Sequence, residues 1–295
     1  MNIKLKNILS YIGKLLGVFG LIFVVHKLSQ EYTIDTFLIK LQAFKYSLFY
    51  LVVLNYISLL LGITAWYLML LNYAKKPFGF ITSYYYFAKT EIAKYLPGNI
   101  FHFVGRQILA NKLTITQKEM MKISLLFSFL LLGATIISST LFTLFSSEIP
   151  AYIKYLMILV TIITLVSSYY LYPSFSLNKK VYMNIILAIS VSLQGIILGL
   201  IVLQQIPTLT INSFFQLVSI YIISWLIGFV TPGASGGLGV REGAFIAIVL
   251  FLHLDISNEI IVFSVLLVRF INILVDILAF LSTYILKNKV QKYIL

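Results

Sequence analysis

The sequence predicts an all-α integral membrane protein made of two inverted repeats, with six transmembrane helices and two re-entrant helical hairpins. Of the 295 residues, 60% are hydrophobic and 11% are charged, and the mean hydropathy is +1.00. Apolar runs of the ~20 residues that cross ~30 Å of hydrocarbon as a helix recur along the chain. A proline-glycine pair followed by an arginine occurs twice inside such runs, at an offset of 135 residues.

Eight hydrophobic blocks are expected in order. The first helix covers about 10–28, and we interpret it as retained because no small-residue cleavage site follows Val25. The other full crossings are predicted at about 46–73, 118–145, 151–172, 182–205 and 257–286. Two more blocks, at about 79–111 and 211–254, are interrupted by Pro97-Gly98 and by Pro232-Gly233. Proline removes a donor and disfavours helix before it, so each pair predicts a sharp turn.

Loop charges favour a hairpin over a single crossing for each broken block. With the N-terminus inside, the lysines at 112–122, 179–180 and 287–292 then fall on the cytoplasmic side, as the positive-inside rule requires. A single crossing by the first block would place the lysines at 112–122 and 179–180 outside. The segment 31–45 has mixed charges and gives no direction. Both termini are therefore expected in the cytoplasm.

The same offset predicts the two repeats. A shift of 135 residues brings the second helix onto the helix at 182–205, and 118–145 onto 253–280. The expected repeats are 1–145 and 146–295, with no soluble domain. Three crossings in each half invert the second copy. Inverted repeats with broken helices that meet near the midplane are typical of transporters.

Composition excludes several other classes of site. There is no cysteine, so disulfides and thiolate metal sites are excluded. The formal charge of +13 is explained by lysines beside membrane helices, and no nucleic-acid partner is expected. His26, His102 and His253 are far apart, so neither a metal site nor a cofactor is expected. No catalytic constellation is evident, and we expect a protein that is not an enzyme.

The arginines point to an anion site. The chain has three, and Arg106 and Arg241 occupy the repeated positions, while Arg269 lies inside the last apolar run. Arginine keeps its charge at any depth and binds phosphate or carboxylate through two nitrogens. An intramembrane arginine costs about 2.5–3.5 kcal/mol. We therefore predict an anion site at the repeat interface.

The first hairpin carries further candidates beside Arg106. Asn99 and His102 are three residues apart, and His102 and Arg106 are four apart, so on a helix they share one face. Glu91 is deep enough to need a cationic partner, either Lys94 or an arginine across the repeat interface. For Lys94, snorkelling toward the membrane surface is the alternative.

The second hairpin has five glycines between Thr231 and Gly243, next to Arg241-Glu242. Gly236, Gly237 and Gly239 are expected to permit a positive φ and the close approach of a ligand or backbone. Tight helix packing is the alternative. A helix that starts after the break would offer free N–H groups to an anion.

The last helix places three polar side chains on one stripe. Arg269, Asn272 and Asp276 are spaced by three and four residues. A structural ion pair between Arg269 and Asp276 and a role in transport both stay open. Either interpretation requires the stripe to face protein or water rather than lipid.

Two motifs resemble those of a known family. Lys94-Tyr95-Leu96-Pro97-Gly98-Asn99-Ile100 with Gly105-Arg106 resembles the first signature of the lysylphosphatidylglycerol synthase/flippase membrane-domain family. Pro232-Gly233 with the run from Gly236 to Gly243 resembles the second, with Ala234-Ser235 inserted. The resemblance implies a multi-pass protein of the bacterial cytoplasmic membrane that moves an anionic or modified lipid between leaflets. The chain resembles a stand-alone member of this family, one without the cytosolic domain that transfers an aminoacyl group from tRNA to phosphatidylglycerol.

The leading hypothesis is therefore a lipid flippase, with a membrane phospholipid or a polyprenyl-phosphate-linked lipid as its partner. In it, Arg106 and Arg241 engage the lipid phosphate, while Glu91 and Glu242 neutralise the arginines. A membrane-embedded transferase is an alternative, although the chain has nine acidic residues and no Asp-x-Asp pair for a metal. An accessory subunit of envelope lipid or polysaccharide synthesis is another. A homo-oligomer or an envelope-synthesis partner stays open.

Overall fold

The computed structural model describes residues 34–95, 101–110, 113, 115–147, 149–171, 175–231 and 235–294. All regular structure in these ranges is helical, which confirms the predicted all-α class. Six of the described helices are long and apolar enough to cross a membrane, and they support a multi-pass membrane protein. They are α3 (Lys45–Leu71), α6 (Gln117–Phe145), α7 (Ala151–Leu171), α8 (Leu177–Gln205), α9 (Ile211–Val230) and α11 (Asn258–Ile294).

Five of the predicted crossings coincide with these long helices. α8 begins at Leu177 rather than at 182, and α11 continues to Ile294 rather than ending near 286. The predicted first helix, 10–28, lies outside the described residues. The sixth long apolar helix is α9, which was expected as the first arm of the second broken block.

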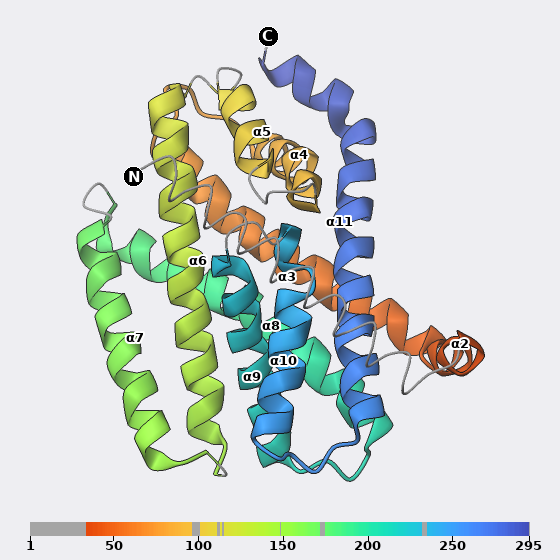
Figure 1. Ribbon diagram of the computed structural model, residues 1–295. Coiled ribbons are helices and arrows are strands. Elements are labelled where there is room, and N and C mark those ends of the chain that lie inside the picture. Colours follow the sequence, from red (N-terminus) through yellow and green to blue (C-terminus); the bar gives the residue numbers. More distant parts are fainter. Residues whose placement is uncertain are drawn as a thin grey trace, which may run out of the picture.

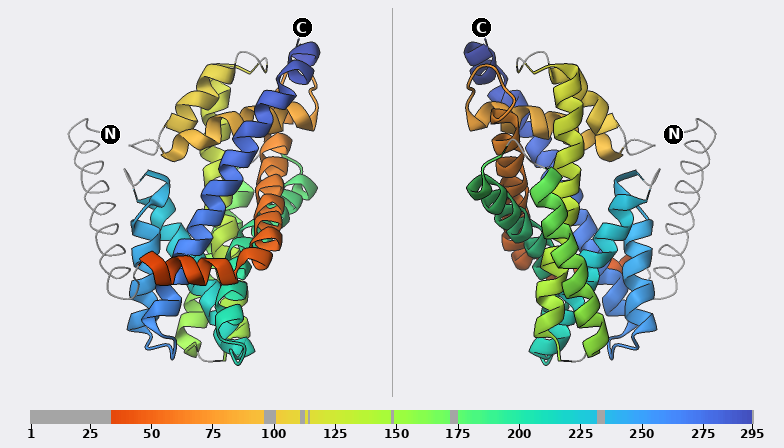
Figure 2. Two further views of the ribbon diagram at one scale, coloured as in Figure 1. Left: turned by 90° about the vertical axis from the view of Figure 1, so that its right-hand side faces the viewer. Right: turned by 90° about the vertical axis from the view of Figure 1, so that its left-hand side faces the viewer.

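The broken blocks form two pairs of helices. The first contains α4 (Phe80–Glu91), the 3-10 turn η1 (Ile92–Tyr95) and α5 (Phe101–Ala110). The second contains α9, the 3-10 turn η3 (Ser235–Gly237) and α10 (Val240–Phe251). In both pairs the consecutive helices pack against each other. Figure 1 shows the α4/α5 pair in the upper part of the bundle and the α9/α10 pair in the lower part, and Figure 2 agrees.

The predicted turn residues are only partly visible. Pro97, Gly98 and Asn99 lie outside the described residues, as do Pro232 and Gly233. The α-helix of the first block already ends at Glu91 and passes into η1 before the proline. A tightened last turn is common where a helix ends.

A short helix, α2 (Ile34–Ala43), was not predicted. Figure 2 shows it lying across the direction of the long helices. Lys40 of α2 forms an ion pair of 2.8 Å with Glu259 in the first turn of α11. The segment carries charges of both signs and is too short to cross a membrane, so the search for apolar runs of spanning length did not find it.

α8 packs against α3, α6 and α9 and is central to the bundle. Small residues allow these close contacts. A Cβ added at Gly195 would come within 2.7 Å of Val218, and one at Gly199 within 2.5 Å of Phe214, both on α9. Glycine at such contacts lets membrane helices approach closely. α7 has no buried residue, so its apolar surface is free to face lipid.

α3 and α8 are joined by a reciprocal contact at their crossing. Ser58 Oγ donates to the carbonyl of Ser190, and Ser190 Oγ donates to the carbonyl of Ser58, each at 2.8 Å. Both residues are buried. Each hydroxyl is thereby satisfied inside the apolar bundle, where an unpaired polar group would be costly.

Candidate functional site

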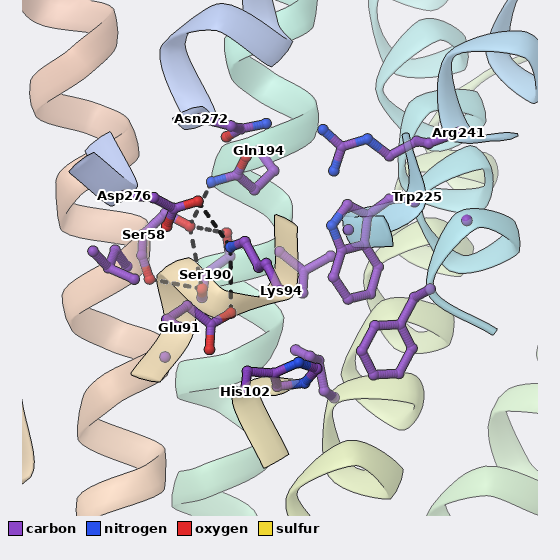
Figure 3. A pocket seen from close by; sticks show the side chains of 18 of the residues that line it. Ser58, Glu91, Lys94, His102, Ser190, Gln194, Trp225, Arg241, Asn272 and Asp276 are labelled. Atoms are coloured by element: carbon purple, nitrogen blue, oxygen red, sulfur yellow. Dashed lines mark hydrogen bonds and ion pairs between the residues drawn. The ribbon is translucent and has the colours of Figure 1, made fainter. Parts of the chain in front are cut away.

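A cavity of about 210 Å³ lies between residues of the two broken blocks. Its walls come from α3, α6, α8, α9 and α11 together with residues of both broken blocks. Figure 3 shows it from close by. The polar and charged residues that line it are Asn55, Ser58, Glu91, Lys94, Tyr95, His102, Arg106, Ser128, Ser190, Gln194, Tyr221, Arg241, Arg269, Asn272 and Asp276.

The two 3-10 turns meet at this cavity. η1 precedes the first break and η3 follows the second, and the two turns are in contact. A Cβ added at Gly236 would lie 3.4 Å from the ring of Tyr95. Segments far apart in sequence therefore form adjoining parts of the cavity wall.

On the α4 side, three charged residues form a connected network. Lys94 Nζ lies 2.8 Å from Asp276 Oδ2 and 3.3 Å from Glu91 Oε1. Tyr95 donates its hydroxyl proton to the same Asp276 oxygen at 2.5 Å. Lys94 therefore does not simply snorkel, because it links its own segment to α11. Figure 3 shows the Lys94 ammonium between the two carboxylates.

Arg106 of α5 is buried, and its guanidinium lies among aromatic rings. Its Nη2 donates to Glu91 Oε2 at 2.8 Å. Four aromatic rings lie 4.6 to 6.0 Å from the guanidinium carbon. They belong to Trp66, Phe87, Phe103 and Phe127. Cation–π contact with desolvated rings stabilises a buried guanidinium, so the charge of Arg106 is largely satisfied within the protein.

His102 lies on the cavity wall one turn before Arg106, and its ring lies against that of Phe103 with centroids 4.0 Å apart and planes tilted by 40°. It is buried, and its Nδ1 has no hydrogen-bond partner among the described residues. It is thus a polar group that a bound ligand could satisfy.

On the α10 side, the glycines form the backbone that precedes the helix. Gly236, Gly237 and Gly239 have φ values of +56°, +72° and +78°. Residues that carry a Cβ rarely adopt these backbone angles, so this turn requires glycine. Gly237 also lies against the backbone of Gly228, where a Cβ would come within 3.3 Å of the carbonyl oxygen. At Gly237 the close approach is therefore to neighbouring backbone, while Gly236 and Gly237 also line the cavity.

Glu242 caps the start of α10 and contacts two arginines. Its Oε2 accepts a hydrogen bond of 2.7 Å from the backbone N–H of Gly239. Its Oε1 lies 3.6 Å from Arg269 Nε and 3.8 Å from Arg241 Nε. These distances allow electrostatic attraction but exceed those of a hydrogen bond. The carboxylate therefore shares its charge between the two guanidinium groups.

Arg269 and Arg241 differ in how they are held. Arg269 Nη2 donates to the carbonyl oxygen of Gly236 at 3.1 Å, and its guanidinium lies over the ring of Tyr95. Arg241 is 5% exposed and donates no hydrogen bond to any described residue. Its guanidinium has the ring of Tyr221 5.5 Å away. Figure 3 shows it extending into the space opposite Lys94 and Asp276.

The cavity also has a neutral polar wall. Asn55 Nδ2 donates to Asn272 Oδ1 at 2.6 Å, and Gln194 Nε2 donates to Ser58 Oγ at 3.0 Å. Trp225 and Phe229, both partly exposed, stack with ring centroids 5.0 Å apart and line the cavity. Figure 3 shows Trp225 beside Arg241.

The structure brings most predicted site residues together. Six of the predicted substrate-binding residues line the cavity, namely Glu91, His102, Arg106, Arg241, Arg269 and Asp276. Two of the predicted hairpin glycines, Gly236 and Gly237, line it as well. Glu242 contacts Arg241 and Arg269.

The contacts decide between two pairs of open alternatives. Arg269 and Asp276, seven residues apart on α11, do not pair with each other, because Arg269 contacts η3 and Asp276 contacts η1. Glu91 has Lys94 as a partner, as one alternative expected, and its arginine partner, Arg106, comes from its own block rather than from across the repeat interface.

Sequence reasoning missed several cavity residues. Asn55, Ser58 and Gln194 lie inside long apolar helices, and Tyr221 and Trp225 lie in α9. A polar residue within a membrane-spanning run rarely faces lipid. Asn55 and Gln194 could have been found by that signal, whereas an aromatic residue carries no comparable mark.

A comparison with models of known protein families, and with curated proteins, finds no match for this chain.

Proposed function

We propose that this chain moves an anionic, phosphate-containing lipid between the leaflets of the bacterial cytoplasmic membrane, and that the cavity binds the lipid headgroup. The observation that carries the proposal is the state of Arg241. Its guanidinium is buried, extends into the cavity and donates no hydrogen bond to a described residue. A buried charge without a hydrogen-bonded partner is costly. A phosphate group would supply two oxygens in the geometry that a guanidinium prefers.

The charge of the lining supports an anionic ligand. Among the described lining residues, four cations, Lys94, Arg106, Arg241 and Arg269, stand against two carboxylates, Glu91 and Asp276. Lys94 and Arg106 are already paired with these carboxylates. The unmatched positive charge therefore lies on the α10 side, where Arg241 and Arg269 share Glu242.

In this proposal the α4/α5 and α9/α10 pairs are re-entrant hairpins that enter the membrane from opposite sides, and both termini are cytoplasmic. Two observations support it. The two pairs occupy opposite ends of the bundle in Figures 1 and 2. Their 3-10 turns, η1 and η3, meet at the cavity.

Movement of the headgroup would follow from changes at α11. Asp276 holds the segment before the first break, and Arg269 holds the segment after the second. Release of one contact while the other persists would open the cavity toward one leaflet. The acyl chains would stay in the lipid, with the stacked rings of Trp225 and Phe229 providing an apolar surface on the cavity wall.

The test uses purified protein in vesicles that contain phosphatidylglycerol with a nitrobenzoxadiazole label on an acyl chain. Dithionite quenches label in the outer leaflet only, so transport is read as continued loss of fluorescence after that leaflet is quenched. We expect continued loss with the native chain, measured with and without imposed proton and sodium gradients. Arg241→Gln should stop the loss at the outer-leaflet fraction.

The control is Lys76→Gln, which removes one positive charge from an exposed loop residue. It should behave like the native chain. Equal rates for the native chain and Arg241→Gln would contradict the proposal, as would label that stays inaccessible under every gradient.

A further inference from the structure

We infer that the headgroup suited to this cavity is a phosphodiester that carries one negative charge and no cationic group. The inference rests on the proposed function and specifies its substrate class. It comes from the number of charges at the cavity and from the partners that each charge already has.

The described charged residues at the cavity do not cancel. The four cations are Lys94, Arg106, Arg241 and Arg269. The three carboxylates are those of Glu91, Asp276 and Glu242, of which the last contacts two of the arginines. Four positive charges against three negative charges leave a net charge of +1 when His102 is neutral. One negative charge on a ligand would therefore balance the cluster.

Charge balance matters here because the cluster is buried. The side chains of Arg106, Arg241 and Glu242 are each 6% exposed or less. An uncompensated charge is costly in a medium of low dielectric constant. A phosphodiester carries one negative charge. A phosphomonoester carries about −1.5 to −2 at pH 7, and a diphosphate also carries more than one, so either would leave excess negative charge in the site.

The carboxylates also exclude a cationic headgroup. Glu91 is paired with Arg106 and Lys94, and Asp276 accepts from Lys94 and Tyr95. Glu242 accepts from the backbone of Gly239 and lies beside two arginines. An ammonium or lysyl group would have to displace one of these partners. Among the described residues no carboxylate faces the cavity unpaired, so zwitterionic and aminoacylated lipids fit poorly.

The rest of the headgroup meets neutral polar atoms. Gln194 lines the cavity; its Nε2 donates to Ser58 Oγ, and its Oε1 accepts no hydrogen bond from a described residue. An amide oxygen held in this way accepts from a hydroxyl group. A hydroxylated, uncharged remainder fits this wall. Phosphatidylglycerol has such a headgroup, and so does a sugar joined to a polyprenyl monophosphate.

The experiment measures equilibrium binding to the purified chain by native mass spectrometry. The probes are phosphatidylglycerol, phosphatidylethanolamine, phosphatidic acid, a polyprenyl-monophosphoryl hexose and a polyprenyl-diphosphoryl hexose. We expect the two lipids with a single anionic phosphodiester to bind at least about tenfold more tightly than the other three. Whichever of these two lipids binds more tightly shows whether the headgroup comes on a glycerophospholipid or on an isoprenoid lipid, and either result supports the inference.

Glu242→Gln provides a second, internal test. A glutamine at this position can still accept from the N–H of Gly239, so the cap of α10 is retained, but the net charge of the cluster rises by one. We expect this variant to shift its preference toward phosphatidic acid and the diphosphate. An unchanged ranking would overturn the inference.

The wild-type ranking tests the inference independently of that variant. Binding of phosphatidic acid or the diphosphate as tightly as phosphatidylglycerol would overturn it while leaving the proposed function intact, provided that Arg241→Gln weakens both. Absence of binding by every anionic probe, or binding that Arg241→Gln leaves unchanged, would overturn the proposed function as well.

Discussion

Lys94 of η1 and Asp276 of α11 form an ion pair of 2.8 Å beside the cavity. Tyr95 donates to the same carboxylate. Two turns earlier on α11, Arg269 holds the carbonyl of Gly236 in η3. One helix therefore fixes the segment before the first break and the segment after the second, and the cavity lies between these contacts.

Removing either partner of this pair should destabilise the protein. Lys94→Gln or Asp276→Asn should each lower the free energy of unfolding by about 1–3 kcal/mol. This is less than for a fully buried pair because the side chain of Lys94 is 24% exposed. Denaturation in mild detergent measures the change. In a double-mutant cycle the pair should show a coupling energy of at least about 0.5 kcal/mol, and additive effects would contradict the contact.

The two repeated arginines should separate stability from binding. Arg106→Gln should lower the free energy of unfolding by about 2–4 kcal/mol, because it leaves Glu91 with Lys94 alone and empties the aromatic enclosure. Arg241→Gln should change stability by less than about 1 kcal/mol or raise it, because it removes a charge without a hydrogen-bonded partner. Thermal melting of both variants measures the difference. Equal losses would show that the two arginines are held alike.

Gly228 should be intolerant of even one methyl group. A Cβ there would come within 2.9 Å of the Cβ of Arg241, so Gly228→Ala should move the start of α10 and cost about 1–3 kcal/mol. Lipid binding should weaken as well, because Arg241 moves with the helix. The matched control is Gly62→Ala in α3, where the nearest atom is 3.9 Å away and alanine should be neutral or stabilising. Similar losses for both variants would contradict the close contact.

Position 236 should tolerate only glycine, because its φ is positive and its neighbours leave little room for a side chain. Its φ of +56° costs a residue with a side chain about 1–2 kcal/mol. A Cβ would also press on Arg269 Nη2 at 3.3 Å and on the ring of Tyr95. Gly236→Ala should therefore lower the melting temperature and loosen the contact between the two turns. Hydrogen exchange of the peptide that contains Tyr95 measures the second effect, and unchanged protection would contradict it.

The long helices were predictable because an apolar run of sufficient length admits one structure in a membrane. α6 and α7 were predicted to within a residue at each end. α2 was missed because a ten-residue segment of mixed charge carries neither the length nor the period of a spanning helix. The end of α4 at Glu91, before the proline, also left no mark in the sequence.

The site was predictable where a charged residue interrupts an apolar run. Arg106, Arg241 and Asp276 were found in this way, and they line one cavity. The sequence did not indicate that Arg106 is enclosed by protein groups whereas Arg241 donates no hydrogen bond to a described residue. The enclosure of Arg106 depends on Trp66 and Phe127, which come from other helices and look like ordinary apolar residues in the sequence.

The central claim is that Arg241 binds the phosphate of a lipid inside the cavity. Electron cryomicroscopy of the chain in nanodiscs rich in phosphatidylglycerol tests it most directly. We predict density for one phosphate within hydrogen-bond distance of the Arg241 guanidinium, and its loss in Arg241→Gln. A cavity without phosphate density in such nanodiscs, or a phosphate held elsewhere while Arg241 stays unoccupied, would contradict the claim.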